Sequence, residues 1–118
     1  MSIYKQFTSE GAGIVEKTAI MPDGTEGKVY FRKCRHSDFE RWRHAEDSDN
    51  PAEVERGKQR FIAACLVEPD GMEVFTDEDS IGLTSEGVAT LFPLALEASG
   101  LVKRPDPKND SGGEASST

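Results

Sequence analysis

The sequence has little of several features that define common protein classes. Only two of its 118 residues are cysteine, so it has no disulfide framework of the kind that stabilises small secreted domains. No run approaches the roughly 18 apolar residues of a membrane-spanning helix. Residues 1–6 lack the apolar core of a signal peptide. These absences predict a soluble cytosolic protein, and the length suits one domain.

Positive charge is also scarce, and its distribution is uneven. Fourteen Lys and Arg face 22 Asp and Glu, a net charge of −8 that disfavours general binding to a phosphate backbone. Residues 61–102 contain eight acids and no base, whereas residues 28–60 are weakly basic. A chain with a weakly basic part and a strongly acidic part can associate head-to-tail with its own copies or bind a basic partner. The alternative is that the acids serve solubility alone.

Motifs for catalysis, metal binding and phosphate binding are missing. Cys34, His36, His44 and Cys65 could supply four zinc ligands, but their spacing matches no zinc-site pattern. The acidic run 77–79 lacks the alternating oxygen ligands of a calcium loop. We therefore expect no enzyme activity, no cofactor and no metal site, two apolar buried cysteines, and surface positions for both histidines.

Basic and aromatic residues alternate between residues 30 and 43, a pattern that also occurs in nucleic-acid-binding proteins. Seven acids in residues 28–60 and the eight that follow argue against that function. We expect the bases to meet acids, within the chain or on another copy. They are Arg32, Lys33, Arg35, Arg41 and Arg43.

The local patterns predict an α+β fold, a predominantly helical single domain with a short N-terminal β-hairpin. Two β-prone runs flank a Pro-Asp-Gly turn, and Pro69-Asp70-Gly71 repeats that turn chemistry. Four helices follow, with Ser37, Asn50, Thr76 and the region of Ser85 at their starts. The predicted organisation is a flexible lead at 1–13, strands at 14–21 and 28–33, a domain over 14–102 and a disordered tail at 103–118.

Two residues conflict with the helices around them. Gly57 should weaken the second turn of its helix by about 1 kcal/mol relative to Ala. Pro93 removes a backbone hydrogen bond from the last helix, which predicts a kink or break near residues 89–92. Gly100 and Leu101 predict the end of that helix.

The stretch from Gly27 to Leu101 resembles the tail assembly chaperones of long-tailed, siphovirus-type bacteriophages. An aromatic strand with basic residues at its end, Lys28 to Lys33, leads directly into a capped helix. An amphipathic helix and Asp70-Gly71 follow, and Ser99-Gly100-Leu101 closes the match. Its most specific segment is Val74 to Asp79, similar to the family's Leu-Phe-Thr-Asp-Glu-Asp. The family-motif residues are Phe75, Thr76, Asp77, Glu78 and Asp79.

The resemblance implies a non-enzymatic chaperone in the host cytoplasm. It would bind the apolar tape-measure protein, keep it soluble while tail-tube subunits assemble, and be absent from the mature virion. It implies self-association, and the major tail tube protein as a second partner. The expected partner-binding residues, on two helical stripes whose alternative role is the domain's own core, are Phe61, Ile62, Leu66, Leu91, Phe92 and Leu96.

Other interpretations of the sequence stay open. The protein could be a structural neck or tail-completion component of the virion, or an unrelated acidic interaction module. The family often makes a longer product by a −1 ribosomal frameshift, and codons for Pro107-Lys108-Asn109 could form a slippery heptamer. We expect neither nucleic acid nor a membrane as a partner.

Overall fold

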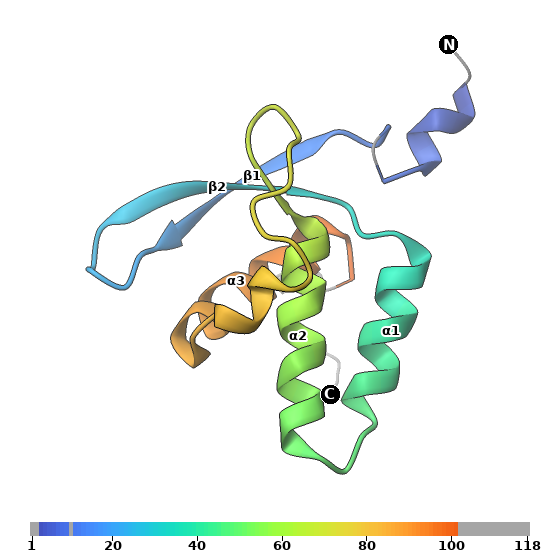
Figure 1. Cartoon of the computed structure of the whole chain (residues 1–118). Helices are drawn as coiled ribbons and strands as arrows, with labels where there is room; N and C mark the ends of the chain where they lie inside the picture. The colour runs from blue at the N-terminus through green and yellow to red at the C-terminus, as the bar shows by residue number, and fades with distance from the viewer. Residues whose placement is uncertain (1–2, 10, 102–118) are drawn as a thin grey trace, which may run out of the picture.

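The computed structural model describes residues 3–9 and 11–101. A three-stranded antiparallel sheet lies over one side of the helices, and α2 packs between α1 and α3 (Figure 1). This arrangement confirms the predicted α+β class. The elements are η1 (Ile3–Phe7), β1 (Ile14–Ile20), β2 (Glu26–Arg32), α1 (His36–Glu46), α2 (Pro51–Cys65), β3 (Leu66–Val67), η2 (Asp79–Gly82) and α3 (Ser85–Ala98).

The hairpin forms where the sequence predicts it. β1 and β2 pair in antiparallel register, with Val15 opposite Phe31 and Ala19 opposite Gly27. Alternation along the strands turns Val15, Ala19 and Phe31 toward the helices, and Phe31 is completely buried. The sheet therefore contributes its apolar face to the core.

The third strand was not expected from the sequence. The amphipathic pattern predicts a helix through Leu66, but α2 ends at Cys65 and Leu66 has extended backbone. Leu66 and Val67 pair with Phe31 and Tyr30 of β2. Pairing with the edge of the hairpin satisfies backbone groups that a longer helix would leave unpaired, so tertiary contact decides the conformation here.

The two Pro-Asp-Gly turns have the same geometry. Gly24 and Gly71 have φ of 90° and 92°, a region that favours glycine. Each donates its N–H to the carbonyl of the residue three positions earlier, at 2.8 Å. The Asp23 and Asp70 carboxylates accept backbone N–H groups two residues later, at 3.0 and 2.9 Å. The sequence echo is thus confirmed as shared turn chemistry.

The start of α1 differs from the prediction. Ser37 lies inside the helix, and the first turn is capped by Asp38, which is 4% exposed. The Asp38 carboxylate accepts the Arg35 backbone N–H at 3.0 Å and the Arg35 guanidinium at 3.1 Å. A buried carboxylate with two donors caps more strongly than an exposed hydroxyl, so the helix begins two residues earlier than expected.

Asn50 and Pro51 begin α2 as predicted, since the Asn50 side chain accepts the Ala52 N–H at 3.0 Å. Gly57 has a role that the sequence does not reveal. It is buried, and an added Cβ would lie within 3.0 Å of the Ala45 Cβ on α1, closer than real Cβ atoms approach. The glycine allows the two helices to pack in close contact.

α3 runs without a break from Ser85 to Ala98, although Pro93 lies inside it. Of the predicted kink or break, the break does not occur, because the remaining hydrogen bonds and the burial of Ala95 and Leu96 hold both halves together. At the end, Gly100 has φ of 77° and donates to the Glu97 carbonyl, while Leu101 donates to Leu96. This Schellman motif confirms the predicted stop.

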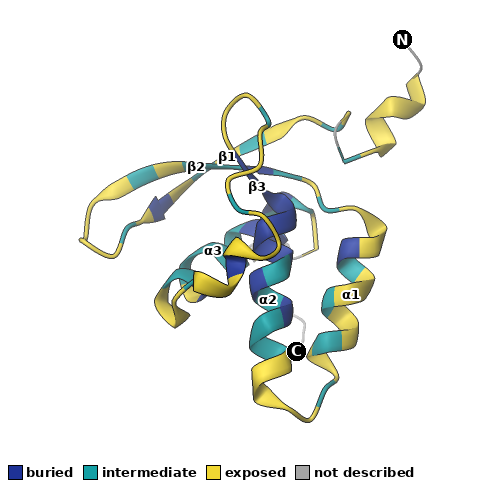
Figure 2. Ribbon diagram, viewed as in Figure 1, coloured by how far each residue is buried: buried dark blue, intermediate teal, exposed yellow. Residues whose placement is uncertain are grey.

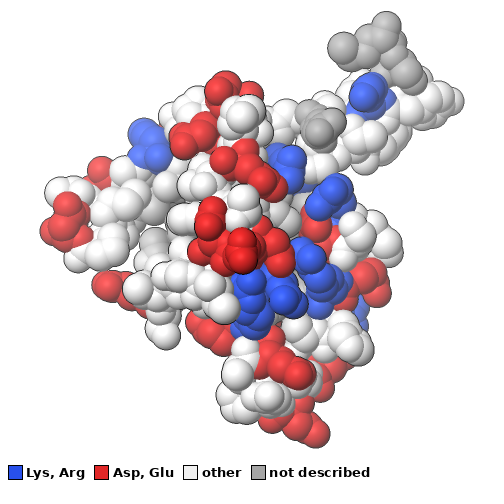
Figure 3. Space-filling model, in the orientation of Figure 1, with Lys and Arg blue, Asp and Glu red and all other residues white. Residues whose placement is uncertain are grey.

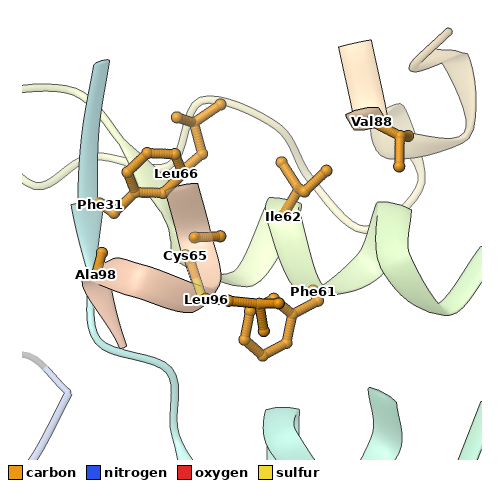
Figure 4. Packing of buried hydrophobic residues seen from close by; sticks show 9 residues of the cluster. Phe31, Phe61, Ile62, Cys65, Leu66, Val88, Leu96 and Ala98 are labelled. Atoms are coloured by element: carbon orange, nitrogen blue, oxygen red, sulfur yellow. The ribbon is translucent and has the colours of Figure 1, made fainter. Parts of the chain in front are cut away.

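The core lies between the sheet, α2 and α3, where the ribbon in Figure 2 is dark blue for buried residues. Figure 4 shows side chains from the three elements converging at this point. Its main members are Phe31, Phe61, Ile62, Cys65, Leu66, Val88, Ala95, Leu96 and Ala98. Trp42 of α1 extends the core by packing against Phe61 and Phe92, with ring centroids 5.7 and 5.4 Å apart.

The predicted lead contains a short 3₁₀ helix, η1, and the tail at 103–118 lies outside the described residues. Within the described part, no helix combines the length and apolar character needed to cross a bilayer.

Candidate functional site

The motif that carries the family resemblance forms a charged junction between three elements. The Asp77 carboxylate lies within 3.8 Å of the Arg41 guanidinium, 4.0 Å of Arg56 and 3.4 Å of Arg60. Arg41 belongs to α1, and the other two arginines belong to α2. Asp77 therefore connects the segment before η2 to both helices.

Backbone contacts strengthen this junction. Arg56 donates to the Asp77 carbonyl at 2.7 Å and to the Ser80 hydroxyl at 2.8 Å. Ser80 is completely buried and donates to the same carbonyl at 2.6 Å. The Thr76 hydroxyl accepts the Asp79 N–H at 3.0 Å, so Thr76 caps the turn that leads into η2, but the helix itself begins at Asp79, later than the sequence predicts. The motif is thus a fixed structural unit.

The remaining motif residues occupy different surroundings. Phe75 is half-buried against the core, whereas Glu78 and Asp79 are exposed. Figure 3 shows acidic side chains gathered over the segment between β3 and α3, beside basic ones over α1 and α2. The expected meeting of bases with acids is confirmed within the chain for Arg35 and Arg41, which pair with Asp38 and Asp77. Arg32 instead donates to the Ala64 carbonyl, and Arg43 lies over the Phe39 ring.

An apolar groove of about 250 Å³ lies between the hairpin, the segment before η2 and the first turns of α3. Its walls are almost entirely hydrocarbon. Ile20 on its rim is 57% exposed and Val74 is 37% exposed, whereas Ala19 at its base is 3% exposed. Principal lining residues are Ala19, Ile20, Val29, Val74, Phe75 and Leu91. The alternating pattern of the strands does not reveal this groove, because elements distant in sequence form it.

The structure divides the six residues predicted to bind a partner. The four buried in the core are Phe61, Ile62, Leu66 and Leu96. In this conformation their side chains are not accessible to another protein, so the alternative role as core describes them. Leu91 and Phe92 are partly exposed, and Leu91 lines the groove. Phe92 packs against Trp42 with Lys58 5.6 Å from its ring centroid.

The four residues considered as zinc ligands are not brought together. His36 and His44 are exposed at opposite ends of α1, as expected, and Cys65 is buried in the core. Cys34 is half-buried, and its backbone N–H donates to the Ser99 hydroxyl at 3.0 Å. Among the described residues, no group of three or more His, Cys, Asp or Glu side chains could hold a metal ion.

Burial controls the chemistry of the two thiols. It raises the pKa of Cys65 to about 12, with a smaller contribution from the neighbouring Cys34. Burial also raises the pKa of Cys34. Both cysteines therefore remain protonated near neutral pH and are poor nucleophiles.

Comparisons with known proteins identify a solved structure with a similar fold. No protein-family model and no curated protein matches the sequence. Among solved structures, the chain is similar to the tail assembly chaperone of bacteriophage HK97, with a TM-score of 0.55 and 15% sequence identity. The match covers 80% of this chain and 94% of that one. The chain therefore has the fold of the HK97 tail assembly chaperone, which confirms at the level of the fold the resemblance seen in its sequence.

Proposed function

We propose that the protein is a phage tail assembly chaperone that binds the tape-measure protein and keeps it soluble while the tail tube assembles. The observation that carries the proposal is the fold shared with the HK97 tail assembly chaperone over 94% of that chain. The residues of the 75–79 motif, which resemble the family's own motif, support it as well. In this proposal the protein acts in the host cytoplasm, without enzymatic activity, and leaves before the virion is complete.

The segment between β3 and α3 has properties suited to holding an apolar chain in solution. Met72 and Ile81 are 66% and 67% exposed, and they lie in the part of the sequence that contains eight acids and no base. An exposed apolar side chain can contact an apolar partner, while the surrounding carboxylates keep the complex hydrated. We therefore assign the tape-measure contact to the exposed side chains of residues 68–84, called here the η2 surface, whose exposed apolar residues include Met72 in the turn after β3 and Ile81 in η2.

Co-expression with the tape-measure protein tests the proposal. The wild-type chain should carry that protein into the soluble fraction and co-purify with it. The double variant Met72→Ser, Ile81→Ser should lose most of this effect, whereas Ala89→Ser, at an exposed position of α3, should keep it. An insoluble tape-measure protein beside wild-type chain, with or without a frameshifted longer product, would refute the proposal.

Mass spectrometry of purified particles separates the chaperone from a structural neck or tail-completion protein. A chaperone should be missing from particles, and stoichiometric presence would favour the structural role. The codons for residues 107–109, which lie outside the described part, decide whether the frameshifted form is available. We also propose that copies self-associate during this activity and that the major tail tube protein is a second partner.

A further inference from the structure

The N-terminal segment before β1 presents apolar side chains away from the domain. In η1, Ile3 is 69% exposed and Phe7 is 87% exposed. Figure 1 shows η1 standing beyond the start of β1, clear of the helices. Such exposure of a large aromatic side chain on an ordered turn is typical of a contact residue. We call residues 3–9 the arm.

The arm has a defined conformation. Thr8 donates its backbone N–H to the Lys5 carbonyl at 3.0 Å, and its hydroxyl bonds to the same oxygen at 2.7 Å. The Ser9 hydroxyl donates to the Lys33 carbonyl, which attaches the arm to the end of β2. A Cβ on Gly11 would overlap the Lys5 carbonyl, so a glycine is required there. The arm is therefore partly preorganised for binding.

The apolar groove offers a complementary site. At about 250 Å³ it falls below the roughly 300–1,000 Å³ of pockets that hold drug-sized ligands, and its size suits one or two side chains. The exposed Ile20 and Val74 widen its rim into an apolar surface.

Charge around the groove matches charge on the arm. Asp23, Glu73 and Glu86 are exposed and directly adjoin groove residues in the sequence. The nearest base on β2, Lys28, points to the other face of the hairpin and pairs with Glu16 at 3.2 Å. Lys5 lies on the arm between Ile3 and Phe7, and η1 has no acid in its first turn. The cationic apolar arm is thus complementary in charge and polarity to the acidic rim of an apolar groove.

The positions of arm and groove decide which copy supplies the occupant. The arm precedes the first residue of β1, and the groove lies at the last residues of that strand. Seven residues of strand separate them by roughly 20 Å. The arm in its observed position points away from its own groove (Figure 1), so a second copy is the source that the geometry favours.

We propose that the arm of one copy binds in the apolar groove of the next, with Phe7 and Ile3 against Ile20, Val74 and Leu91 and with Lys5 at the acidic rim. This inference rests on the proposed self-association and specifies its two surfaces. Because the surfaces differ, the contact is heterologous and repeats head-to-tail, producing a ring or an open helical assembly. In this arrangement Leu91 contacts another copy, whereas the family resemblance implies that it contacts the tape-measure protein.

Sedimentation velocity on the full chain tests the contact with three single variants. Phe7→Ser removes the main arm side chain, and Ile20→Ser changes an exposed residue of the groove. Ala52→Ser is the control, because it places a serine at an exposed position at the start of α2, outside the arm, the groove and the η2 surface. We expect tenfold to hundredfold weaker self-association for Phe7→Ser, as complete burial of a large apolar side chain implies, and a smaller loss for Ile20→Ser. Ala52→Ser should associate like wild type.

Mixing the two defective variants gives a sharper result. A chain with a defective arm keeps a good groove, and a chain with a defective groove keeps a good arm, so an equimolar mixture should form heterodimers and stop there. Homodimers or no association in the mixture would overturn the proposal. So would a monomeric wild-type chain, or wild-type association of Phe7→Ser. Tape-measure solubility, measured with the same variants, is a separate readout, so the chaperone proposal can stand or fall independently.

Discussion

The contact between Gly57 and Ala45 yields the most direct test of how α1 and α2 pack. From helix propensity alone, Gly57→Ala should stabilise the protein by about 1 kcal/mol, because Gly is a poor residue for a helix interior. The structure predicts the opposite. The new Cβ would lie within 3.0 Å of the Ala45 Cβ, whereas carbon atoms pack best at about 3.5–4.0 Å.

The magnitude follows from the lack of a flexible atom at this contact. Both Cβ atoms are fixed to helix backbones, so relief requires α1 and α2 to separate by at least about 0.5 Å. Separation weakens the packing of Trp42 against Phe61, whose ring centroids are 5.7 Å apart. Overpacking of a core costs about 1–3 kcal/mol, and two Cβ atoms that cannot rotate apart place this contact in the upper part of that range, about 2–3 kcal/mol. The propensity gain of about 1 kcal/mol offsets part of this cost. We expect a net loss of about 1–2 kcal/mol in unfolding free energy.

Chemical denaturation and thermal melts measure this loss. A decrease of about 1–2 kcal/mol should lower the melting temperature by roughly 5–10 °C for a domain of this size. Gly82→Ala is the control, because a Cβ there meets nothing within 4 Å, and it should change stability by less than about 0.5 kcal/mol.

The double variant Ala45→Gly, Gly57→Ala completes the cycle. It moves the methyl group from one helix to the other, so the overlap disappears and the two propensity effects cancel. Its stability should return to within about 0.5 kcal/mol of wild type, although each single change is destabilising. A stabilising Gly57→Ala, or a double variant that loses the sum of the two single effects, would refute the close-packing interpretation.

Three further outcomes are expected. Asp77→Ala should lower the unfolding free energy by about 1–2 kcal/mol because it removes contacts with several guanidinium groups, and added salt should reduce the difference from wild type. Glu78→Ala, at an exposed position, is the control and should be nearly neutral when both variants are measured by urea denaturation. Cys65 should react with a thiol reagent at pH 8 only after unfolding. Because its pKa of about 12 in the folded protein exceeds the ordinary 9.0, its contribution to stability should be complete below pH 9 and should be lost as the pH rises from 9 to 12. A Cys65→Ala variant with an unchanged alkaline stability profile would contradict this assignment. Asn50→Ala should lose about 1 kcal/mol through the missing cap of α2, and calorimetry showing no change would mean that the 3.0 Å bond to Ala52 contributes nothing.

Local chemistry is what the sequence predicts well. The hairpin, the Asn50 cap, both Pro-Asp-Gly turns and the Gly100 stop depend on residues near one another in the chain. Their backbone requirements can be derived from a few neighbouring residues. The Thr76 cap belongs to the same class.

Features that depend on distant residues were missed or wrong. β3 exists because the hairpin offers an edge to Leu66, and α1 begins early because buried Asp38 accepts two donors. Gly57 contradicts helix propensity because Ala45 occupies the space beside it. The apolar groove combines strand, loop and helix residues, so no single periodicity indicates it. The helical stripe at Phe61 is correctly predicted to be apolar, and the structure selects burial in the core from the two roles that the sequence leaves open.

The last turn of α3 determines when the domain can close during synthesis. The Ser99 hydroxyl accepts the backbone N–H of Cys34, 65 positions earlier, and Glu97 pairs with Lys17, 80 positions earlier. At about 5–20 residues per second, the ribosome needs roughly 3–13 s to add those 65 residues. Throughout that interval the apolar face of β2 lacks the helix that covers it, and the same holds for α2 from the time it is made. Nascent chains are therefore open to contact with other proteins before they have a complete core.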